Sequence, residues 1–386
     1  MNILMLSEDP VLAVPGSEAH ERVREYARVC GEMTVVVLTA DAAVRGMGAM
    51  DSLTWYAAAA RSPFLRRWRA FRMVRTLCRR RRFDALTVQA PDEMGLLMYL
   101  FARVYGIPLQ VQVHADIMSP WYRRASWRER ACYYFARFLL PRADGIRVVS
   151  ERIARSLTGQ PMCVPRERIS ILPVATDISR FISAVPDSEL TRRFSNFSFK
   201  IIAVGRFVER EKNFFLLIRA MARLVEKNPY ALLVLVGAGP DEARYRRAII
   251  SRKLERNIII EPWRTDLPVF LKSFDCLALS SYFEGWGRVV VEAMAAGVPV
   301  IMTDVGLAGE LVHNGREGLV VAIDDEIGFA GALATMAGDR ALRTSMGERA
   351  QDAVSGHLDN SREKYLADYR ASFLRLVGAL RNRALQ

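Results

Sequence analysis

SSYFEGWGRVVVEAMAAGVPVI, residues 280–301, contains the end of a buried strand, a glycine-rich loop, a helix and the next buried strand. A strand, a helix and a strand in such close succession predict a parallel βαβ unit. The stretch also places two acids eight residues apart, Glu284 in the loop and Glu292 in the helix. Either they are incidental surface charges, or the loop and the helix together hold one ligand.

The same alternation of strand and helix extends in both directions along the chain. A first series starts with the strand NILMLS and a second with FKIIAVGRF, while residues 173–195 between them lose the periodicity and carry two prolines, as a linker does. We therefore predict an α/β protein of two doubly wound Rossmann-like domains, residues 1–175 and 196–360, with a C-terminal helix over 361–386. Ligands of such sheets bind beyond the carboxyl ends of the strands, so we expect the site in a cleft between the domains.

Composition excludes several classes of protein. The chain has 386 residues, of which 51% are hydrophobic and 25% charged, as in a globular protein and unlike a disordered one. Its five cysteines form no CxxC pair and its four histidines are scattered, so we expect reduced thiols and no metal site. The N-terminus has no basic leader, and no uncharged apolar stretch reaches membrane-spanning length. These features predict a cytoplasmic protein.

The formal net charge of +13 is concentrated in residues 61–83, which hold ten arginines and no acid. Apolar residues recur there at helical spacing and form a stripe of Phe64, Trp68, Phe71, Val74 and Cys78. One interpretation is a helix that packs its apolar stripe on a sheet and leaves a solvated basic face. A second is a helix that lies on an anionic membrane surface. Nucleic-acid binding is disfavoured, because the chain has no zinc finger, RNP aromatic pair or KH-type GXXG loop, and we expect no nucleic-acid partner.

Two further loops of the second half follow predicted strands. In VGRFVEREKN, Arg206 comes directly after a strand and Lys212 precedes a helix. Two cations at a strand end and a helix N-terminus are suited to a diphosphate, although surface cations near a turn are the simpler interpretation. In LVGAGPDE, Gly237 and Gly239 allow either the close approach of a ligand or a tight turn.

The loop within residues 280–301 completes the pattern. Gly285 and Gly287 let the backbone bend, so that N–H groups at the start of the helix can face an anion. Glu284 and Glu292 then become acceptors for ligand hydroxyl groups. One ligand with a diphosphate, a ribose and a sugar would occupy both acids and both cations, which indicates a nucleotide-sugar.

The order of GR…EKN, VGAGPD and EGWGRVVVEAMAAGVPVI resembles the retaining glycosyltransferases of family 4, which carry two glutamates at this interval. The resemblance covers the chain from its first strand to its last helix. It implies the GT-B architecture, in which the two domains face each other across a cleft and the C-terminal helix returns to the N-terminal domain. By resemblance, Glu284 contacts the transferred sugar, Glu292 the ribose, and Arg206 and Lys212 the diphosphate.

The same resemblance gives roles to residues outside these loops. His114, in VQVHAD, matches a histidine that faces the sugar near the reacting carbon, although a polar residue at a strand end is the simpler interpretation. Gly16 matches a glycine-rich loop beside donor and acceptor, and the backbone near Trp263 and Arg264 matches the part that contacts the base. Three residues depart from the family pattern and leave their contacts less defined: Gly16 stands alone where relatives have a glycine pair, Trp286 replaces a common Phe, and Arg288 is charged.

We thus expect an enzyme that transfers a sugar, with retention, from a nucleoside-diphosphate sugar to a glycan or a polyprenyl-diphosphate-linked acceptor of bacterial surface polysaccharide or glycolipid assembly. UDP-sugars are the first choice of donor and GDP-mannose the second. The chain has no Asp-x-Asp, and we expect neither metal nor cofactor. Residues 61–83 would then bind an anionic membrane, on which the protein is peripheral. The alternatives are a UDP-sugar 2-epimerase of the same fold and a non-catalytic nucleotide-sugar binder, while the chain is too short for a glycogen-type phosphorylase.

Overall fold

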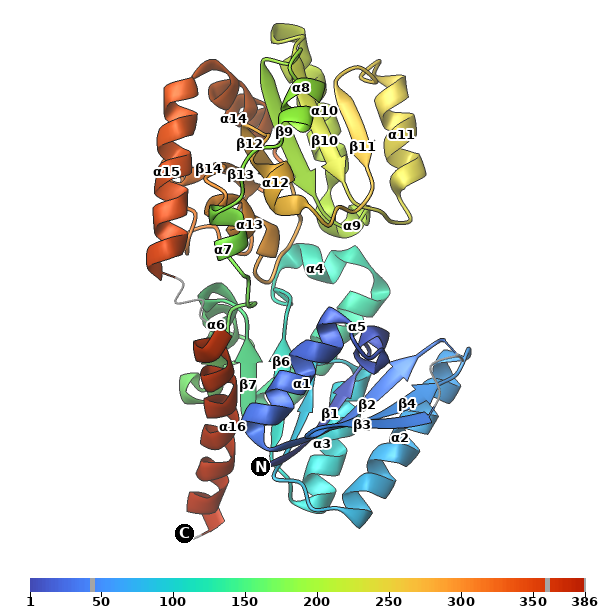
Figure 1. Ribbon diagram of the computed structural model, residues 1–386. Helices are drawn as coiled ribbons and strands as arrows, with labels where there is room; N and C mark the ends of the chain where they lie inside the picture. The colour runs from blue at the N-terminus through green and yellow to red at the C-terminus, as the bar shows by residue number, and fades with distance from the viewer. Residues whose placement is uncertain (42–45, 358–361, 385–386) are drawn as a thin grey trace. The chain divides into compact units, whose positions relative to one another are not determined.

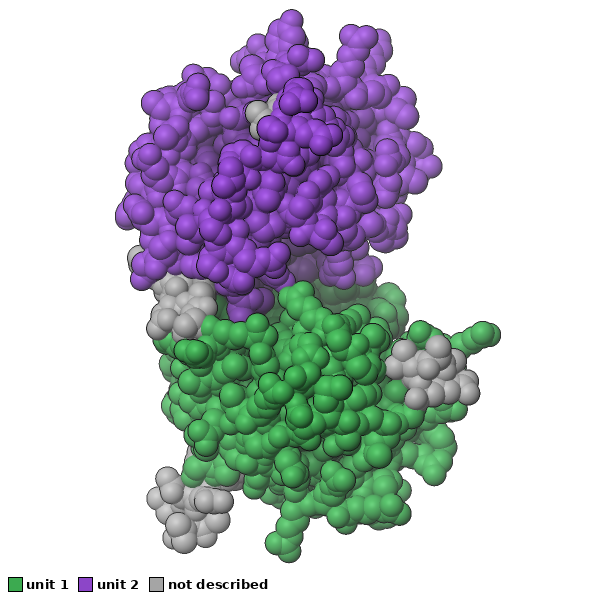
Figure 2. Space-filling view, in the orientation of Figure 1, with its two compact units in different colours: residues 1–173, 361–386 green, residues 174–360 purple. Residues whose placement is uncertain are grey.

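A computed structural model describes residues 1–41, 46–357 and 362–384. Contacts within the chain divide it into two compact units, which Figure 2 shows in different colours. Unit 1 consists of Met1–Pro173 together with Ser361–Gln386, and unit 2 of Val174–Asn360. Both are α/β, with one sheet each (Figure 1).

The sheet of unit 1 has eight strands in the order β3-β4-β2-β1-β5-β6-β7-β8. All neighbouring strands are parallel except β3 and β4, which form an antiparallel hairpin at one edge. The strands are β1 (Asn2–Ser7), β2 (Glu32–Thr39), β3 (Gly46–Met50), β4 (Leu53–Ala59), β5 (Ala85–Val88), β6 (Leu109–Val113), β7 (Gly145–Val148) and β8 (Ile169–Ile171). Strands β1, β2, β5, β6 and β7 are buried along nearly their whole length, as expected for a sheet with helices on both faces.

The helices of unit 1 begin at side-chain caps that the sequence supplies. Ser17, Ser62, Asp92 and Ser150 each accept a hydrogen bond from a backbone N–H of the first turn that follows them. The helices are α1 (Glu18–Cys30), α2 (Pro63–Arg80), α3 (Glu93–Tyr105), α4 (Pro120–Ala125), α5 (Trp127–Leu139), α6 (Glu151–Thr158) and α16 (Arg362–Ala384), with 3-10 turns η1 (Pro10–Ala13), η2 (Leu140–Arg142) and η3 (Arg166–Arg168). Within the described ranges, none of the helices combines the length and apolar character needed to cross a bilayer.

Helix α16 returns to unit 1 and packs against α1, which confirms the expected path of the C-terminal helix (Figure 1). The ring of Tyr369 stacks on Tyr26 with 4.0 Å between centroids. Tyr369 and Phe373 are fully buried in the same hydrophobic cluster as residues of β1 and β2. The last helix in the sequence is therefore part of the core of the first unit.

Two predictions for the first half of the chain were incomplete. The hairpin of β3 and β4 was not foreseen, because its strands are short, rich in alanine and glycine, and lack a long β-branched run. Helix α2 forms as predicted, but only the C-terminal half of its apolar stripe is buried. Val74 is inaccessible, whereas Phe64 is 78% exposed and Trp68 45% exposed. The first half of the stripe therefore faces outward.

Unit 2 has a six-stranded sheet, in which every pair of neighbours is parallel and the order is β11-β10-β9-β12-β13-β14. The strands are β9 (Phe199–Val204), β10 (Ala231–Val236), β11 (Ile258–Glu261), β12 (Cys276–Leu279), β13 (Val300–Thr303) and β14 (Gly318–Val321). Their near-continuous runs of valine, isoleucine and leucine are typical of buried parallel strands. This confirms the second doubly wound unit.

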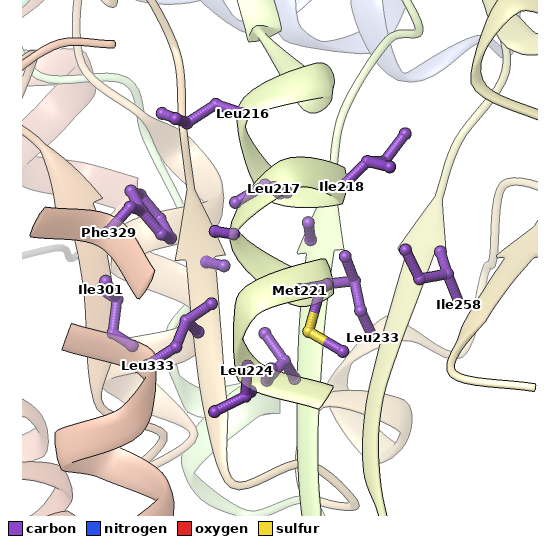
Figure 3. Packing of buried hydrophobic residues seen from close by; sticks show 14 of the residues in the cluster. Leu216, Leu217, Ile218, Met221, Leu224, Leu233, Ile258, Ile301, Phe329 and Leu333 are labelled. Carbon is purple, nitrogen blue, oxygen red and sulfur yellow. The ribbon is translucent and has the colours of Figure 1, made fainter. Parts of the chain in front are cut away.

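The core of unit 2 lies between the sheet and helix α10 (Figure 3). Leucines of α10, with Met221, pack on Leu233 and Ile258 of the sheet and on Phe329 and Leu333 of α14. The helices are α7 (Ser179–Ile182), α8 (Ser188–Arg193), α9 (Glu209–Lys212), α10 (Phe214–Lys227), α11 (Glu242–Ser251), α12 (Leu267–Leu271), α13 (Arg288–Ala295), α14 (Glu326–Gly338) and α15 (Arg340–His357).

The stretch that the sequence predicts to be a linker, residues 173–195, belongs almost entirely to unit 2 and contains the short helices α7 and α8. Phe194 at its end is 1% exposed and contacts Phe270 and Phe274. The two prolines interrupt the helical pattern, but the aromatic side chains between and after them are still buried in the second unit.

Candidate functional site

The predicted contact residues of unit 2 come together because its sheet is parallel throughout. Loops that follow β9, β10, β11, β12 and β13 all leave from the same edge of the sheet, the carboxyl edge. Arg206 follows β9, Gly237 follows β10 and Glu284 follows β12. This edge is therefore the candidate site of unit 2.

Lys212 and Glu284, 72 residues apart in the sequence, form an ion pair between Nζ and Oε1. Lys212 is the last residue of α9, and its carbonyl oxygen accepts a hydrogen bond from the Ser280 hydroxyl at 2.8 Å. The hydroxyl of Ser281 donates to Glu284 Oε1 at 2.7 Å. Both charged side chains are less than one-fifth exposed, so the ion pair is held in one place at the carboxyl edge.

Arg206, on the loop after β9, is more exposed than this pair. Its guanidinium contacts Glu211 of α9 at 2.8 Å. The carbonyl oxygen of Glu211 accepts the N–H of Tyr282 at 2.9 Å, which ties the loop after β9 to the loop after β12. Sequence reasoning missed Glu211, although it stands inside the quoted motif.

Helix α13 begins where the glycines of the quoted stretch predict. Gly287 precedes it with φ +86°, a left-handed conformation that favours glycine. Glu292, one turn into the helix, is buried and pairs with Arg288 at 2.8 Å. Trp286 is buried, whereas Arg288 is exposed, so these two of the three departures from the family pattern lie in different environments.

Gly237 and Gly239 are required by the protein's own packing. A Cβ at Gly237 would lie 1.9 Å from the carbonyl oxygen of Gly205, and one at Gly239 would lie 2.5 Å from that of Phe207. Gly306, which the sequence analysis did not single out, packs in the same way against Trp286. A Cβ at Gly306 would lie 2.8 Å from the carbonyl oxygen of Trp286. These glycines let neighbouring loops of the carboxyl edge touch backbone to backbone.

Trp263 and Arg264 follow β11, the edge strand of the sheet. Trp263 is 53% exposed. The Arg264 guanidinium forms two hydrogen bonds with Asp266, at 2.8 and 2.6 Å, and lies over the ring of Phe270. The side chain of Arg264 is therefore already held within the protein, while the adjoining backbone and Trp263 remain at the surface.

A cavity of about 560 Å³ opens among the loops of the same edge. It is lined by Glu209, Arg210, Asp241 and Arg244, together with Tyr282. Burial raises the pKa of Glu209 to about 7, and the charge of Asp241 acts in the same direction. Sequence reasoning missed Glu209, because its burial depends on loops that meet only in the folded sheet.

In unit 1, His114 follows the last residue of β6 and belongs to a buried hydrogen-bond network. Gln112 Oε1 accepts from His114 Nε2 and from Arg147 Nη1, both at 3.1 Å. Arg147 also donates to the hydroxyl of Tyr365 on α16, at 2.5 Å. An amide oxygen only accepts, so the proton of the neutral His114 ring is on Nε2.

The electrostatic surroundings keep His114 neutral. Burial of the imidazole lowers the pKa of His114 well below that of an ordinary histidine. The positive charges of Arg147 and Arg22 lower this pKa further. Taken as a whole residue, His114 is nevertheless exposed to solvent. A neutral imidazole with its Nδ1 lone pair unengaged by Gln112 can accept a hydrogen bond from a ligand.

Gly16 lies in the exposed loop before α1, with φ +81° and open space where a side chain would stand. Gly16 and His114 are in unit 1, and the other predicted contact residues are in unit 2. Among the residues that the structure describes, no three histidine, cysteine, aspartate or glutamate side chains are grouped closely enough to hold a metal ion.

Two family models match the chain. Residues 190–353 match glycosyl transferases group 1, and residues 15–175 match the glycosyl transferase 4-like domain. The first model covers the whole carboxyl edge described above, from Arg206 to Gly306. The second covers Gly16 and His114.

Comparison with individual proteins gives the same family. The lipopolysaccharide core biosynthesis glycosyltransferase LpsE of Rhizobium meliloti is 34% identical over 156 residues, which are 40% of this chain and 44% of that protein. The UDP-Gal:alpha-D-GlcNAc-diphosphoundecaprenol alpha-1,3-galactosyltransferase of Escherichia coli is 23% identical over 274 residues, 69% of each protein. The matched segments thus cover 44% of the length of the first relative and 69% of the length of the second.

Among solved structures, Anabaena HepE in complex with UDP-glucose has a TM-score of 0.72 at 18% identity, covering 98% of this chain and 100% of that chain. Identity this low shows the fold alone, and the fold is that of the GT-B glycosyltransferases. Together with the two matched models, it leads to one assignment. The chain belongs to the glycosyl transferases group 1.

Proposed function

We propose that the protein is a retaining glycosyltransferase that transfers a sugar from a nucleoside-diphosphate sugar, with UDP-sugars favoured over GDP-mannose. The observation that carries the proposal is the pairing of Lys212 with Glu284 at the carboxyl edge of unit 2, with Arg206 on the adjoining loop. Two cations and a carboxylate at one sheet edge suit a ligand that carries both a diphosphate and hydroxyl groups. HepE, solved with UDP-glucose, and the Escherichia coli galactosyltransferase support the choice of a UDP-sugar.

The charges suggest how the reaction proceeds. The bond between the anomeric carbon and the diphosphate oxygen breaks, and the acceptor hydroxyl forms the new bond on the same face of the sugar. Arg206, Lys212 and the N-terminus of α13 stabilise the charge that grows on the departing diphosphate. Glu284 positions the sugar hydroxyls, Glu292 the ribose, and the leaving phosphate takes the acceptor proton. His114 accepts a hydrogen bond from the sugar, and no divalent metal takes part.

A thermal-shift panel of UDP, GDP, ADP and their common sugars tests the donor site. A ligand present at a hundred times its dissociation constant stabilises the folded state by about 2.7 kcal/mol, which is measurable. We expect one nucleotide to shift the wild type but not Glu292→Gln. Asp275→Asn is the matched control, because Asp275 is also hydrogen-bonded but lies directly before β12, at the opposite edge of the sheet. No shift from any nucleotide in folded wild-type protein would contradict the proposal.

Product analysis with one labelled donor separates the alternatives. A transferase moves the label to an added acceptor, a UDP-sugar 2-epimerase returns an epimerised donor, and a non-catalytic binder leaves the donor unchanged. We expect the transferred sugar to keep its anomeric configuration by NMR, and we expect chelation of divalent metals to leave the rate unchanged. Inversion would contradict the retaining mechanism.

We further propose that the acceptor is a glycan or a polyprenyl-diphosphate-linked glycan, and that unit 1 binds an anionic membrane surface. Large apolar side chains are exposed on three helices that pack side by side, α2, α3 and α5. They include Phe64, Leu65, Leu100, Val104, Trp127, Tyr134 and Phe138. Arginines stand among them, with Arg103 lying over Tyr99 and Arg142 over Phe138. Aromatic side chains interleaved with arginine suit the interface of an anionic bilayer.

Co-sedimentation with lipid vesicles tests membrane binding. We expect the wild type to sediment with vesicles that contain phosphatidylglycerol, and to do so more weakly as the salt concentration rises. With vesicles of phosphatidylcholine alone, we expect the protein to stay in the supernatant. Phe64→Ser with Val104→Ser should reduce binding, while Ile327→Ser in unit 2, equally exposed, should not. Equal recovery on both kinds of vesicle at low salt would argue against binding to an anionic membrane surface.

A further inference from the structure

A cavity of about 860 Å³ lies between helix α2 and the strand β4 near the edge of the unit 1 sheet. Among the described residues, its lining includes four arginines, Arg69, Arg72, Arg80 and Arg81, and no acid. We call it the arginine pocket. It belongs to unit 1 and shares no residue with the carboxyl edge of unit 2.

The pocket follows from the spacing of residues on α2 and from the small side chains opposite. Arg69, Met73, Thr76 and Arg80 are separated by four, three and four residues, so they form one stripe along the helix. The stripe faces the last residues of β4, where Ala57 and Ala59 line the cavity. Alanine side chains cannot fill the space between the helix and the strand, and a hollow remains.

Within the part of the chain that the structure describes, none of the four guanidinium groups forms an ion pair with a carboxylate. Arg67 on the same helix differs, because it pairs with Glu93 of α3. Four like charges around one hollow repel one another, and an anion inside the hollow would relieve that repulsion.

Two of the four guanidinium groups are also held in place. Arg69 donates to the carbonyl oxygen of Ala59, and Arg72 lies over the ring of Trp68 with 4.8 Å to its centroid. Side chains that are already ordered lose less entropy when a ligand binds. An ordinary solvated face, such as that formed by Arg75 and Arg79 outside the pocket, has neither the concave shape nor these contacts.

We propose that the arginine pocket binds a ligand through its phosphate or diphosphate group. Guanidinium forks match the oxygens of phosphate, and Trp68 and Tyr56 add aromatic faces for the organic part of the ligand. The volume lies within the range of about 300–1,000 Å³ that is usual for small-molecule sites. The site is additional to the donor site and does not depend on whether the protein transfers a sugar. The phosphate belongs either to a soluble phosphorylated saccharide or to a lipid headgroup.

Calorimetric titration with inorganic pyrophosphate tests the pocket in the full-length protein. We expect Arg72→Gln with Arg80→Gln to weaken binding by about tenfold or more, as the loss of charge-assisted hydrogen bonds implies. Arg75→Gln with Arg79→Gln is the matched control, since it removes the same charge from the same helix outside the pocket. Pyrophosphate that binds near Arg206 and Lys212 in unit 2 contributes the same heat in both double variants. The difference between the two variants therefore reports on the pocket.

Equal loss of affinity in the two double variants would overturn the proposal, because binding would then reflect only the charge of the helix. So would unchanged binding in the pocket variant, or an absence of pyrophosphate binding by the wild type. Circular dichroism of each variant verifies that α2 is still folded, which is expected because all four substituted side chains are exposed.

Two further measurements identify the source of the phosphate. If it belongs to a lipid, phosphatidylglycerol vesicles displace pyrophosphate, and the pocket variant loses vesicle binding to a greater extent than the control variant. If it belongs to a soluble ligand, a sugar 1-phosphate displaces pyrophosphate, and both double variants lose vesicle binding equally.

Discussion

Among single residues, Gln112 connects two groups that are far apart in the sequence. Its Oε1 atom accepts from His114 and from Arg147, a buried arginine that also donates to the hydroxyl of Tyr365. The amide thereby fixes the tautomer of His114 and keeps the positive charge of Arg147 near the ring. The positive charge of Arg147 favours a neutral imidazole, whereas the hydrogen bond to Gln112 only selects the ring nitrogen that carries the proton.

Replacing this amide by a carboxylate should reverse the charge that His114 experiences. We expect Gln112→Glu to raise the pKa of His114, because a nearby negative charge stabilises the imidazolium. Gln112→Met, which removes the acceptor without adding charge, should leave that pKa low. The chain has four histidines, so NMR titration resolves their signals and His114→Asn assigns the one in question. An unchanged pKa in folded Gln112→Glu would show that the network does not control His114.

Glycines of unit 2 allow a second test at the same scale. Gly237→Ala should destabilise unit 2 by at least about 2 kcal/mol, because the new Cβ would meet the carbonyl oxygen of Gly205 at 1.9 Å. Gly331→Ala should instead stabilise it by up to about 1 kcal/mol, since Gly331 lies inside α14 with open space around it. Urea unfolding of both variants measures the two effects. Equal stability of Gly237→Ala and wild type would mean that the two loops separate without cost.

Among the elements, helix α3 depends on a cap whose charge is costly. Asp92 accepts the N–H groups of Met94 and Gly95 at 2.9 and 3.0 Å. Burial nevertheless raises its pKa to about 6, and Glu8 and Glu93 act in the same direction. In the unfolded chain the pKa is near 3.8. The folded state therefore holds the proton more tightly, and Asp92 makes the protein less stable as the pH rises from about 4 to about 6.

Asp92→Asn should remove this pH dependence and keep the cap, because asparagine caps helices as well as aspartate does. Relative to the wild type, we expect the variant to gain about 1–3 kcal/mol in its free energy of unfolding between about pH 4 and pH 7. Asp92→Ala should lose about 1 kcal/mol of cap energy at both pH values. Denaturant unfolding at the two pH values is the measurement, and parallel pH profiles for Asp92→Asn and wild type would contradict the assignment.

At the scale of the whole molecule, α16 completes a unit that began more than 300 residues earlier in the chain. It brings Tyr369 onto Tyr26 and supplies Tyr365 to the buried Arg147. The first unit is therefore built from both ends of the chain, whereas unit 2 is continuous.

Tyr369→Ala should destabilise unit 1 by about 3–5 kcal/mol, as expected for truncation of a fully buried aromatic residue. Hydrogen exchange read by mass spectrometry should become faster in β1, β2 and α1 and remain unchanged in the strands of unit 2. Leu374→Ala on the exposed side of α16 is the control and should have little effect. Uniformly faster exchange in both units would contradict the division into two compact units.

Local patterns explain which predictions succeeded. Unbroken apolar runs predicted β1, β2, β9 and β10, because a parallel strand covered on both faces must be apolar along its length. The glycine at position 287 predicted the start of α13, since the required φ is one that only glycine adopts readily. The hairpin of β3 and β4 was missed, because its strands are stabilised by their place beside β2 and not by their own composition.

By itself, the sequence determined the two series of parallel strands, the carboxyl edge on which the loops of unit 2 gather and the family to which the chain belongs, because these depend on periodicity and motifs within short segments. Only the tertiary structure decided that Lys212 pairs with Glu284, that Gly237 makes room for Gly205, that α2 and β4 enclose the arginine pocket, and that Arg147 connects α16 to His114. Most of these contacts join residues that are distant in the sequence, and the pocket forms only where α2 packs beside β4. Their geometry depends on packing across the folded unit, which no local pattern records.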